Sequence, residues 1–477
     1  MITFLASIVL LILGYIFYSK MVEKVFGIDD NRKTPAYTKQ DGLDFMPMSW
    51  AKGSLIQLLN IAGLGPIFGA IMGALYGPVA FIWIVVGAIF AGAVHDYFAG
   101  MMSVRHGGDQ YPSIVGRYLG TTVKTIINII SIILMILVAA AFTAGPAQLL
   151  SSVTPLSFTV AIFIIFGYFL VAALLPINKI IGRIYPIFGA VLIFMALAIG
   201  IGLLFQDQPI PNLTFENLHP QELPIWPLIM ITISCGAISG FHSTQSPIIA
   251  RTMRKESDGR KVFYGAMIVE AIIAMIWAAA AMTFFGNTGG LQAMLSEGGP
   301  AGVVDHISKS MLGTLGGILA IIGVIILPVT TGDTALRSSR MMLVDLLRNF
   351  WKLEAKWKQS LLAIPVIIPT FYLTQIDYSF LWRYVGWTNQ VVATVMLWTA
   401  AIYLLQKGKF HWICSIPALF MTGVVGTYIF YAPEGFSLPY PVSVGIGLAV
   451  TTVVAIWFIF QMRKAKLAQL EQKQNVA

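Results

Sequence analysis

Ionisable and polar side chains stand inside long apolar stretches of this sequence. Ser239, His242 and Ser246 follow one such stretch at spacings of three and four residues, so that they can share one face of a helix. An imidazole there can donate to an anion or carry a proton, because histidine titrates near neutral pH. We therefore take His242 as a candidate functional residue, with a packing histidine as the alternative.

Asp333 is the sharpest candidate for ion coupling. It follows Thr330 and Thr331, and a carboxylate beside two hydroxyls could hold Na⁺ or accept a proton. The alternative is an ion pair with Arg337, one helical turn further along.

Asp96 and Glu270 are further candidates for coupling. Asp96 follows His95, and Arg105 lies close enough in sequence to form a structural ion pair with it instead. Glu270 has apolar neighbours on both sides, so proton relay and packing against a hydroxyl are both open. Asn389 and Gln390 could line a cavity or form hydrogen bonds between helices.

Two apolar segments contain signals that a plain membrane helix lacks. One carries Gly63, Gly65 and Pro66, and the other carries Gly236 and Gly240 around Ser239. Proline removes a backbone donor and glycine lowers the cost of unwinding, so both segments are predicted to be broken. Paired broken helices mark substrate sites in secondary transporters. The alternative is that the small residues only allow close packing of helices. We place the substrate against Gly63, Gly65, Pro66, Gly236, Ser239, Gly240, His242, Ser246, Asn389 and Gln390.

The composition requires a membrane. Of 477 residues, 57% are hydrophobic and 11% are charged, against roughly 25% charged in soluble domains. About 20 apolar residues span a bilayer, which predicts an all-α polytopic protein with about thirteen transmembrane helices. Their expected limits are 1–19, 54–75, 78–101, 125–148, 158–177, 183–205, 225–248, 262–286, 311–335, 360–376, 380–405, 411–431 and 440–462.

The distribution of basic residues supports this count. With the N-terminus outside and the C-terminus in the cytoplasm, all but two of the 30 Lys and Arg residues lie on the cytoplasmic side. The exceptions are Lys309 and Arg383. The basic tail 463–477 is expected at the anionic lipid surface of the cell membrane.

The two broken segments are the second and seventh predicted spans, which run in opposite directions. This predicts a LeuT-type five-plus-five inverted repeat: spans 2–6 form residues 54–205 and spans 7–11 form residues 225–405. Spans 1, 12 and 13 are additions, the first with the basic loop in residues 1–53 and the last two in residues 411–462. The whole chain is then one membrane domain.

Several motifs make the chain resemble the carbon starvation protein A family, in family order over most of its length. They are Asp41-Gly-Leu-Asp-Phe-Met-Pro47, Ile61-Ala-Gly-Leu-Gly-Pro66, Ala91-Gly-Ala-Val-His-Asp96, Ser234-Cys-Gly-Ala-Ile-Ser-Gly-Phe-His242, Asp333-Thr-Ala-Leu-Arg337 and Asn389-Gln390. The resemblance implies an importer of pyruvate or short peptides in the amino acid–polyamine–organocation superfamily. Gln57 stands where longer members tend to have histidine, so a proton-handling role there does not carry over.

The leading hypothesis is a secondary active importer of small carboxylate-bearing nutrients, coupled to H⁺ or Na⁺. The alternatives are a passive channel or facilitator and an intramembrane enzyme using Ser239 and His242, which lacks a Gly-x-Ser-x-Gly nucleophile elbow. The sequence has no nucleotide-binding loop and no linear metal-binding spacing, so we expect neither a cofactor nor a metal. Basic residues lie between apolar segments, so lipid and a small substrate, not nucleic acid, are the expected partners.

Overall fold

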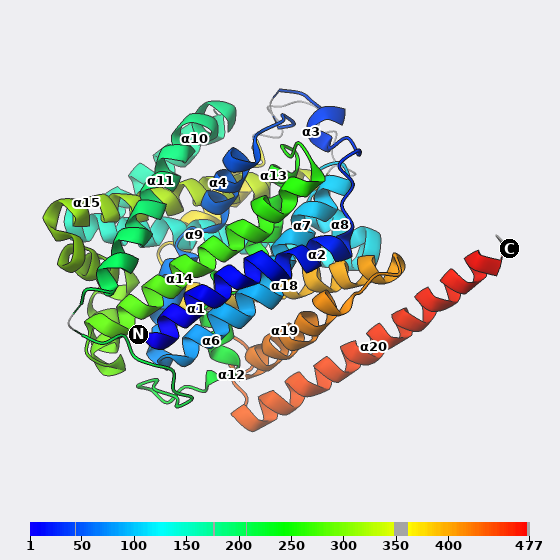
Figure 1. Ribbon diagram of the computed structural model, residues 1–477. Helices are drawn as coiled ribbons and strands as arrows, with labels where there is room; N and C mark the ends of the chain where they lie inside the picture. Colours follow the sequence, from blue (N-terminus) through cyan, green and yellow to red (C-terminus); the bar gives the residue numbers. More distant parts are fainter. Residues whose placement is uncertain (43, 175–176, 207, 348–360, 475–477) are drawn as a thin grey trace.

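The computed structural model describes residues 1–477 except 43, 175–176, 207, 348–360 and 475–477. Its regular elements in the described part are helices, as the composition predicts, apart from one isolated β-bridge between Met48 and Met253 (Figure 1). Small pieces of the fifth and tenth predicted spans and of the tail, namely residues 175–176, 360 and 475–477, lie outside the described residues.

Most of the α-helices overlap the predicted apolar stretches; two short helices, Pro35–Thr38 and Tyr111–Leu119, lie in predicted loops, and one helix begins at residue 288 instead of 311. The α-helices are α1 (Ile2–Leu13), α2 (Ser19–Phe26), α3 (Pro35–Thr38), α4 (Trp50–Ile61), α5 (Ala70–Gly73), α6 (Val79–Val86), α7 (Ala93–Arg105), α8 (Tyr111–Leu119), α9 (Thr121–Val153), α10 (Phe158–Leu174), α11 (Ile177–Leu203), α12 (Ile225–Thr232), α13 (Gly240–Ala250), α14 (Gly265–Phe284), α15 (Thr288–Leu347), α17 (Ile364–Leu373), α18 (Tyr378–Gln406), α19 (Trp412–Tyr431) and α20 (Tyr440–Gln474). Within α15 the chain bends at Gly299 and Gly313, whose φ angles of 60° and 63° suit glycine.

Eight helices of the described chain are long and apolar enough to cross a membrane, or nine if one bent pair is a single span. The remaining predicted spans correspond to the shorter apolar helices in α10, α11 and α17 and to the interrupted pair α12 and α13. The protein is therefore polytopic and all-helical. Thirteen crossings and the inverted repeat remain predictions.

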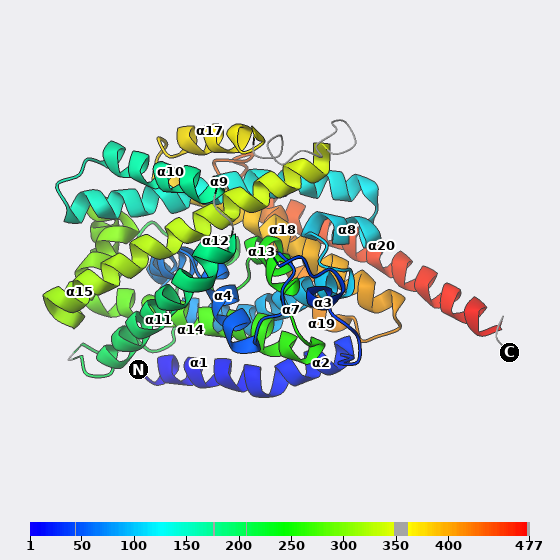
Figure 2. The ribbon, with the colours of Figure 1, turned by 90° about the horizontal axis from the view of Figure 1, so that it is seen from above.

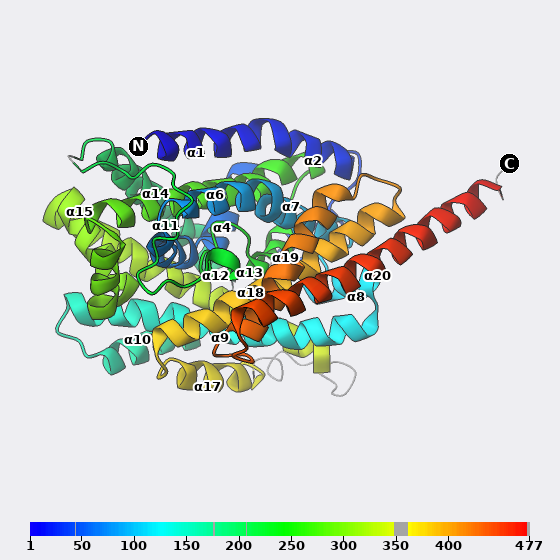
Figure 3. The same ribbon diagram turned by 90° about the horizontal axis from the view of Figure 1, so that it is seen from below.

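The centre of the bundle is formed by α4, α7, α13, α14 and α18. Helix α13 packs against α7, α18 and α4, and α14 packs against α4. Figures 2 and 3 show α1 and α2 along one edge of the bundle and α10 and α17 along the opposite edge, while α20 extends past it. Asp96, His242 and Glu270 thus come from these central helices, whereas Asp333 lies on α15.

The loops gather at two ends, as the distribution of basic residues predicts. At one end the N-terminal amino group donates to the carbonyl of Ile210 at 2.5 Å, in the loop predicted outside. At the other end Arg105 donates to the carbonyl of Gly27, and Arg251 donates to that of Gly108. The grouping of the loops agrees with the sequence, and the assignment of the second end to the cytoplasm stays a prediction.

Candidate functional site

Both predicted breaks are present. Helix α4 ends at Ile61, and the segment Gly65–Tyr76 continues at an angle of 57° to it. Helix α12 ends at Thr232 and α13 begins at Gly240, with Gly236 between them at φ +90°, a conformation that favours glycine. Backbone irregularity at membrane depth requires surrounding protein or a water-filled cavity.

The two breaks pack directly on each other. A Cβ added at Gly65 would lie 2.2 Å from Cys235 Cβ, and one added at Gly236 would lie 3.8 Å from Pro66 Cα. The glycines that sequence analysis assigned to the substrate site therefore also allow the broken segments to touch. Gly63 likewise faces Phe142 at a distance that leaves no room for a side chain.

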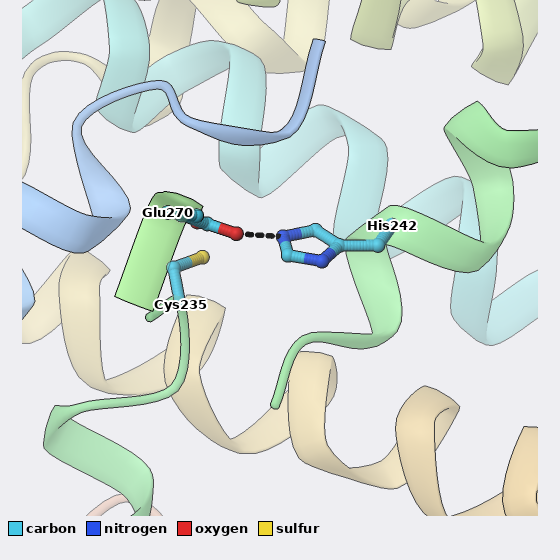
Figure 4. Close-up of side chains that lie close together, drawn as sticks. All are labelled: Cys235, His242 and Glu270. Carbon is cyan, nitrogen blue, oxygen red and sulfur yellow. Dashed lines mark ion pairs between the residues drawn. The ribbon is translucent and has the colours of Figure 1, made fainter. Parts of the chain in front are cut away.

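A continuous chain of four ionisable side chains crosses this junction. Asp96 on α7 contacts His95 Nδ1 at 2.8 Å through one carboxylate oxygen and His242 Nδ1 at 2.9 Å through the other. The second nitrogen of His242, Nε2, lies 3.4 Å from Glu270 Oε2 on α14 (Figure 4). All four side chains are fully buried, with 0% exposure. Three candidates that are far apart in the sequence, Asp96, His242 and Glu270, thus form one site.

Asn389 on α18 fixes the start of α13. Its side-chain oxygen accepts from the backbone N–H of Phe241 at 2.6 Å, and its amide contacts Ser239 Oγ at 3.0 Å. Gln390 donates to the carbonyl of Met230 on α12 at 2.8 Å. Both residues therefore form the interhelical hydrogen bonds that were the alternative to lining a cavity.

Ser246 connects α13 to α4, because Gln57 donates to its hydroxyl at 3.3 Å. Ser239 Oγ contacts Asn389 and Cys235, while the ring nitrogens of His242 face the two carboxylates. The enzyme hypothesis requires a hydrogen bond between Ser239 as nucleophile and His242 as base. Among the described contacts the side chains of Ser239 and His242 do not contact each other.

Asp333 is not part of this chain of charges. It lies 3.5 Å from Arg337 in the i,i+4 ion pair considered above, in a small cavity that Arg340 and Phe169 also line. Thr331 does reach the first broken helix and donates to the carbonyl of Leu59 at 3.3 Å, whereas Thr330 donates to Leu327 one turn back. A coupling role for these three residues remains a prediction.

The ion pair considered between Asp96 and Arg105 is wrong. Arg105, at the end of α7, instead binds Glu256 through two nitrogens, at 3.2 and 2.9 Å, and Tyr403 at 2.8 Å. Asp96 lies more than two helical turns before Arg105 on α7, so the two side chains cannot meet. Proximity in sequence suggested the pair of Asp96 and Arg105, but the two partners of Arg105 come from other helical segments.

A cavity of about 500 Å³ opens at the end of the bundle that carries the N-terminus. Its wall includes Ile231 and Thr232, the last residues of α12 before the break. Tyr378 and Trp382 also line it, and their hydroxyl and indole N–H are buried without a hydrogen-bond partner among the described residues. Arg383, one of the two basic residues predicted outside, lies beside them and pairs with Glu434.

Sequence analysis missed Tyr378, Trp382 and Cys235 as site residues. The available signals were the single arginine among aromatic residues at 378–384 and the cysteine within the broken segment. Neither signal is specific without the fold, since cysteine and aromatic residues are common in apolar helices.

These features, a polytopic bundle with buried charges between two interrupted helices, define a membrane transporter. The chain belongs to the carbon starvation protein CstA family, whose profile matches residues 1–217, 147–287 and 276–427. It is similar to an uncharacterized membrane protein of Haemophilus influenzae, with 45% identity over 62% of this chain and 95% of that one.

Two relatives carry functional names. The peptide transporter CstA of Campylobacter jejuni is 25% identical over 98% of this chain and 84% of its own length. The pyruvate/proton symporter BtsT of Escherichia coli is 27% identical over 58% of this chain and 48% of its own. Among solved structures, a manganese transporter of Eremococcus coleocola has a TM-score of 0.52 at 15% identity, covering 89% of this chain and 99% of its own. That likeness concerns the fold alone.

Proposed function

We propose that this chain is a secondary active importer of small carboxylate-bearing nutrients, pyruvate or short peptides, driven by an inward gradient of H⁺ or Na⁺. The observation that carries the proposal is the junction of two interrupted helices around a buried chain of charges. Such a junction gives a substrate or ion a polar site at membrane depth, and movement of the broken segments could expose it to either side in turn.

A cation suits the junction because acceptors outnumber donors there. The buried carboxylate of Glu270 has its closest ion-pair partner, His242 Nε2, at 3.4 Å, and Gln57 Oε1 and Asn60 Oδ1 on α4 are buried without a hydrogen bond among the described residues. Buried acceptors that lack donors are costly, and a bound cation would satisfy them. The name of the Escherichia coli relative makes H⁺ the first coupling ion to test.

The cavity above α12 is the proposed entry for substrate. Tyr378 and Trp382 in its wall carry two donors without partners among the described residues, which lie buried behind the cavity surface and would have to turn toward a carboxylate to bind it. At about 500 Å³ the cavity lies within the ordinary range for small-molecule sites and admits either a three-carbon acid or a dipeptide. The start of α13 contributes less than the sequence suggests, because Asn389 already occupies the Phe241 N–H.

The test is uptake of radiolabelled pyruvate and of a labelled dipeptide into proteoliposomes, with pH and Na⁺ gradients imposed separately. We expect one substrate to accumulate under one gradient, and Asp96→Asn to abolish accumulation. Asp333→Asn, which removes the carboxylate paired with Arg337, is the matched variant. If it abolishes accumulation as completely as Asp96→Asn does, both carboxylates take part in coupling. Equilibration without accumulation under every gradient would instead indicate a passive facilitator, and failure to transport either substrate would refute the proposed substrate class.

For the entry cavity, Tyr378→Phe and Trp382→Phe each remove one donor while keeping an aromatic ring. We expect the KM for substrate to rise by roughly 5- to 10-fold for each, from a lost hydrogen bond of about 1 kcal/mol. An unchanged KM in both variants would remove the cavity from the substrate path.

A further inference from the structure

Three different metal-binding side chains converge at the second break. The thiol of Cys235, the imidazole of His242 and the carboxylate of Glu270 each offer one ligand atom, and these atoms all lie within 4.8 Å of one another. Figure 4 shows that they come from three segments: the linker before α13, α13 itself and α14. We propose that Cys235, His242 and Glu270 bind a divalent transition-metal cation of the zinc and cobalt type.

The choice of donors favours this class of metal. Sulfur and imidazole ligands select zinc and similar ions, whereas Na⁺, Mg²⁺ and Ca²⁺ favour oxygen. Two ligands held about 2.05 Å from a tetrahedral zinc lie about 3.3 Å apart. The observed separation of 3.4 Å between His242 Nε2 and Glu270 Oε2 matches that edge. A sulfur–nitrogen edge is about 3.6 Å by the same geometry, so closure onto the sulfur requires a movement of at most about 1.2 Å.

The surroundings of His242 supply an independent observation. Its Nδ1 contacts Asp96 at 2.9 Å, and Asp96 in turn contacts His95. A carboxylate on one imidazole nitrogen orients the ring and leaves the other nitrogen for a metal, as in carboxylate–histidine–zinc sites. Here the other nitrogen, Nε2, faces Glu270 Oε2 at 3.4 Å on the side where the Cys235 thiol also lies.

The balance of charge and hydrogen bonding also points to a cation. Glu270 is completely buried, and its Oε2 lies 3.4 Å from His242 Nε2, longer than an ordinary hydrogen bond. A divalent cation would neutralise this carboxylate together with the Cys235 thiolate, and the thiol proton would be released on binding. Asp96 and His95 would remain as the outer pair that holds the imidazole.

Cys235 differs from an ordinary buried cysteine in its position. The described residues include one other cysteine, Cys414, which is buried in α19 as a free thiol outside this cluster. Cys235 instead lies in the irregular linker, against Gly65 of the other broken helix. Metal binding there would tie the linker to α14. If the proposed transport function holds, the metal should therefore inhibit uptake, but metal binding itself does not depend on transport.

The experiment is a Co²⁺ titration of the full-length protein, purified in detergent without a polyhistidine tag. We expect a near-ultraviolet thiolate-to-cobalt charge-transfer band that saturates at one ion per chain, with release of protons. Cys235→Ser should abolish the band, while Cys414→Ser should leave it unchanged. Glu270→Gln should weaken binding, and Asp96→Asn should weaken it roughly 10- to 100-fold while keeping the band, because it acts through His242.

The absence of a thiolate band in the wild-type protein would overturn the proposal. So would a band that persists in Cys235→Ser or disappears in Cys414→Ser. Size-exclusion profiles and melting curves of the metal-free variants establish that each is folded. Should Cys235→Ser fail to fold, zinc protection of Cys235 from a thiol reagent in the wild-type protein, read by mass spectrometry against Cys414, decides the matter. If the wild-type protein binds cobalt but transports neither substrate, the proposed function is refuted and the metal site is still supported.

Discussion

The contact between Gly65 and Cys235 makes a quantitative prediction about the two breaks. A Cβ at position 65 would lie 2.2 Å from Cys235 Cβ, whereas carbon atoms at their optimal separation are about 3.5–4.0 Å apart. Gly65→Ala must therefore move the broken segments apart by roughly 1.3 Å or more. Overpacking of this kind typically costs about 1–3 kcal/mol. We expect a loss of this size in the free energy of unfolding, measured in mixed micelles, together with slower uptake.

A double variant tests the cause directly. Cys235→Gly removes the other Cβ of this contact. In a double-mutant cycle, the variant with both Gly65→Ala and Cys235→Gly should lose less unfolding free energy than the sum of the two single losses, by about 0.5–3 kcal/mol. The control is Gly445→Ala on α20, where an added Cβ meets nothing within 4 Å. That substitution should stabilise the helix by about 0.5–1 kcal/mol. Wild-type stability in Gly65→Ala, or additivity of the two substitutions, would refute the direct packing of the breaks.

Three other perturbations follow from individual contacts. Asn389→Ala leaves the amide at the start of α13 buried without an acceptor and should cost about 1–3 kcal/mol in unfolding free energy, while Asn389→Asp, which keeps the acceptor, should cost less. Arg105→Lys loses the two-nitrogen contact with Glu256 and should lower the melting temperature, an outcome contradicted if lysine performs equally well. Burial lowers the pKa of His106, which lies just past α7 and contacts the hydroxyl of Tyr118. The neutral imidazole of His106 therefore contributes to folding stability fully above the unfolded pKa of about 6.5, and this contribution is lost as the pH falls toward the lower folded pKa. His106→Gln should flatten the acid side of the profile of melting temperature against pH.

The class of fold was predictable from the sequence because it depends on composition and on local signals. Apolar stretches located the helices, and Gly65-Pro66 and Gly236 located the breaks, since proline and a positive φ angle act within a few residues. The grouping of loops at two ends followed from the distribution of Lys and Arg, because loop charge governs insertion.

The partners of the charged residues were not predictable in the same way. His242 and Glu270 were both singled out, but nothing in their spacing shows that α13 brings His242 between Glu270 and Asp96. Arg105 was assigned a neighbour in sequence and instead binds Glu256, 151 residues away. Such pairings depend on helix packing, which one sequence records only as scattered polar residues.

The irregular backbone and the buried charges of this junction explain each other. Other helices satisfy polar backbone groups that the second break exposes: Trp83 donates to the carbonyl of Ile233 at 3.0 Å, and Asn389 accepts from the amide of Phe241 in the first turn of α13. The carboxylate of Glu270 also interacts with the backbone amide of Gly236, within the break itself. His242 Nε2 and Glu270 Oε2 face each other at 3.4 Å, which is longer than an ordinary hydrogen bond. A buried pair at this distance is only partly compensated, and this is the physical reason for proposing a cation there.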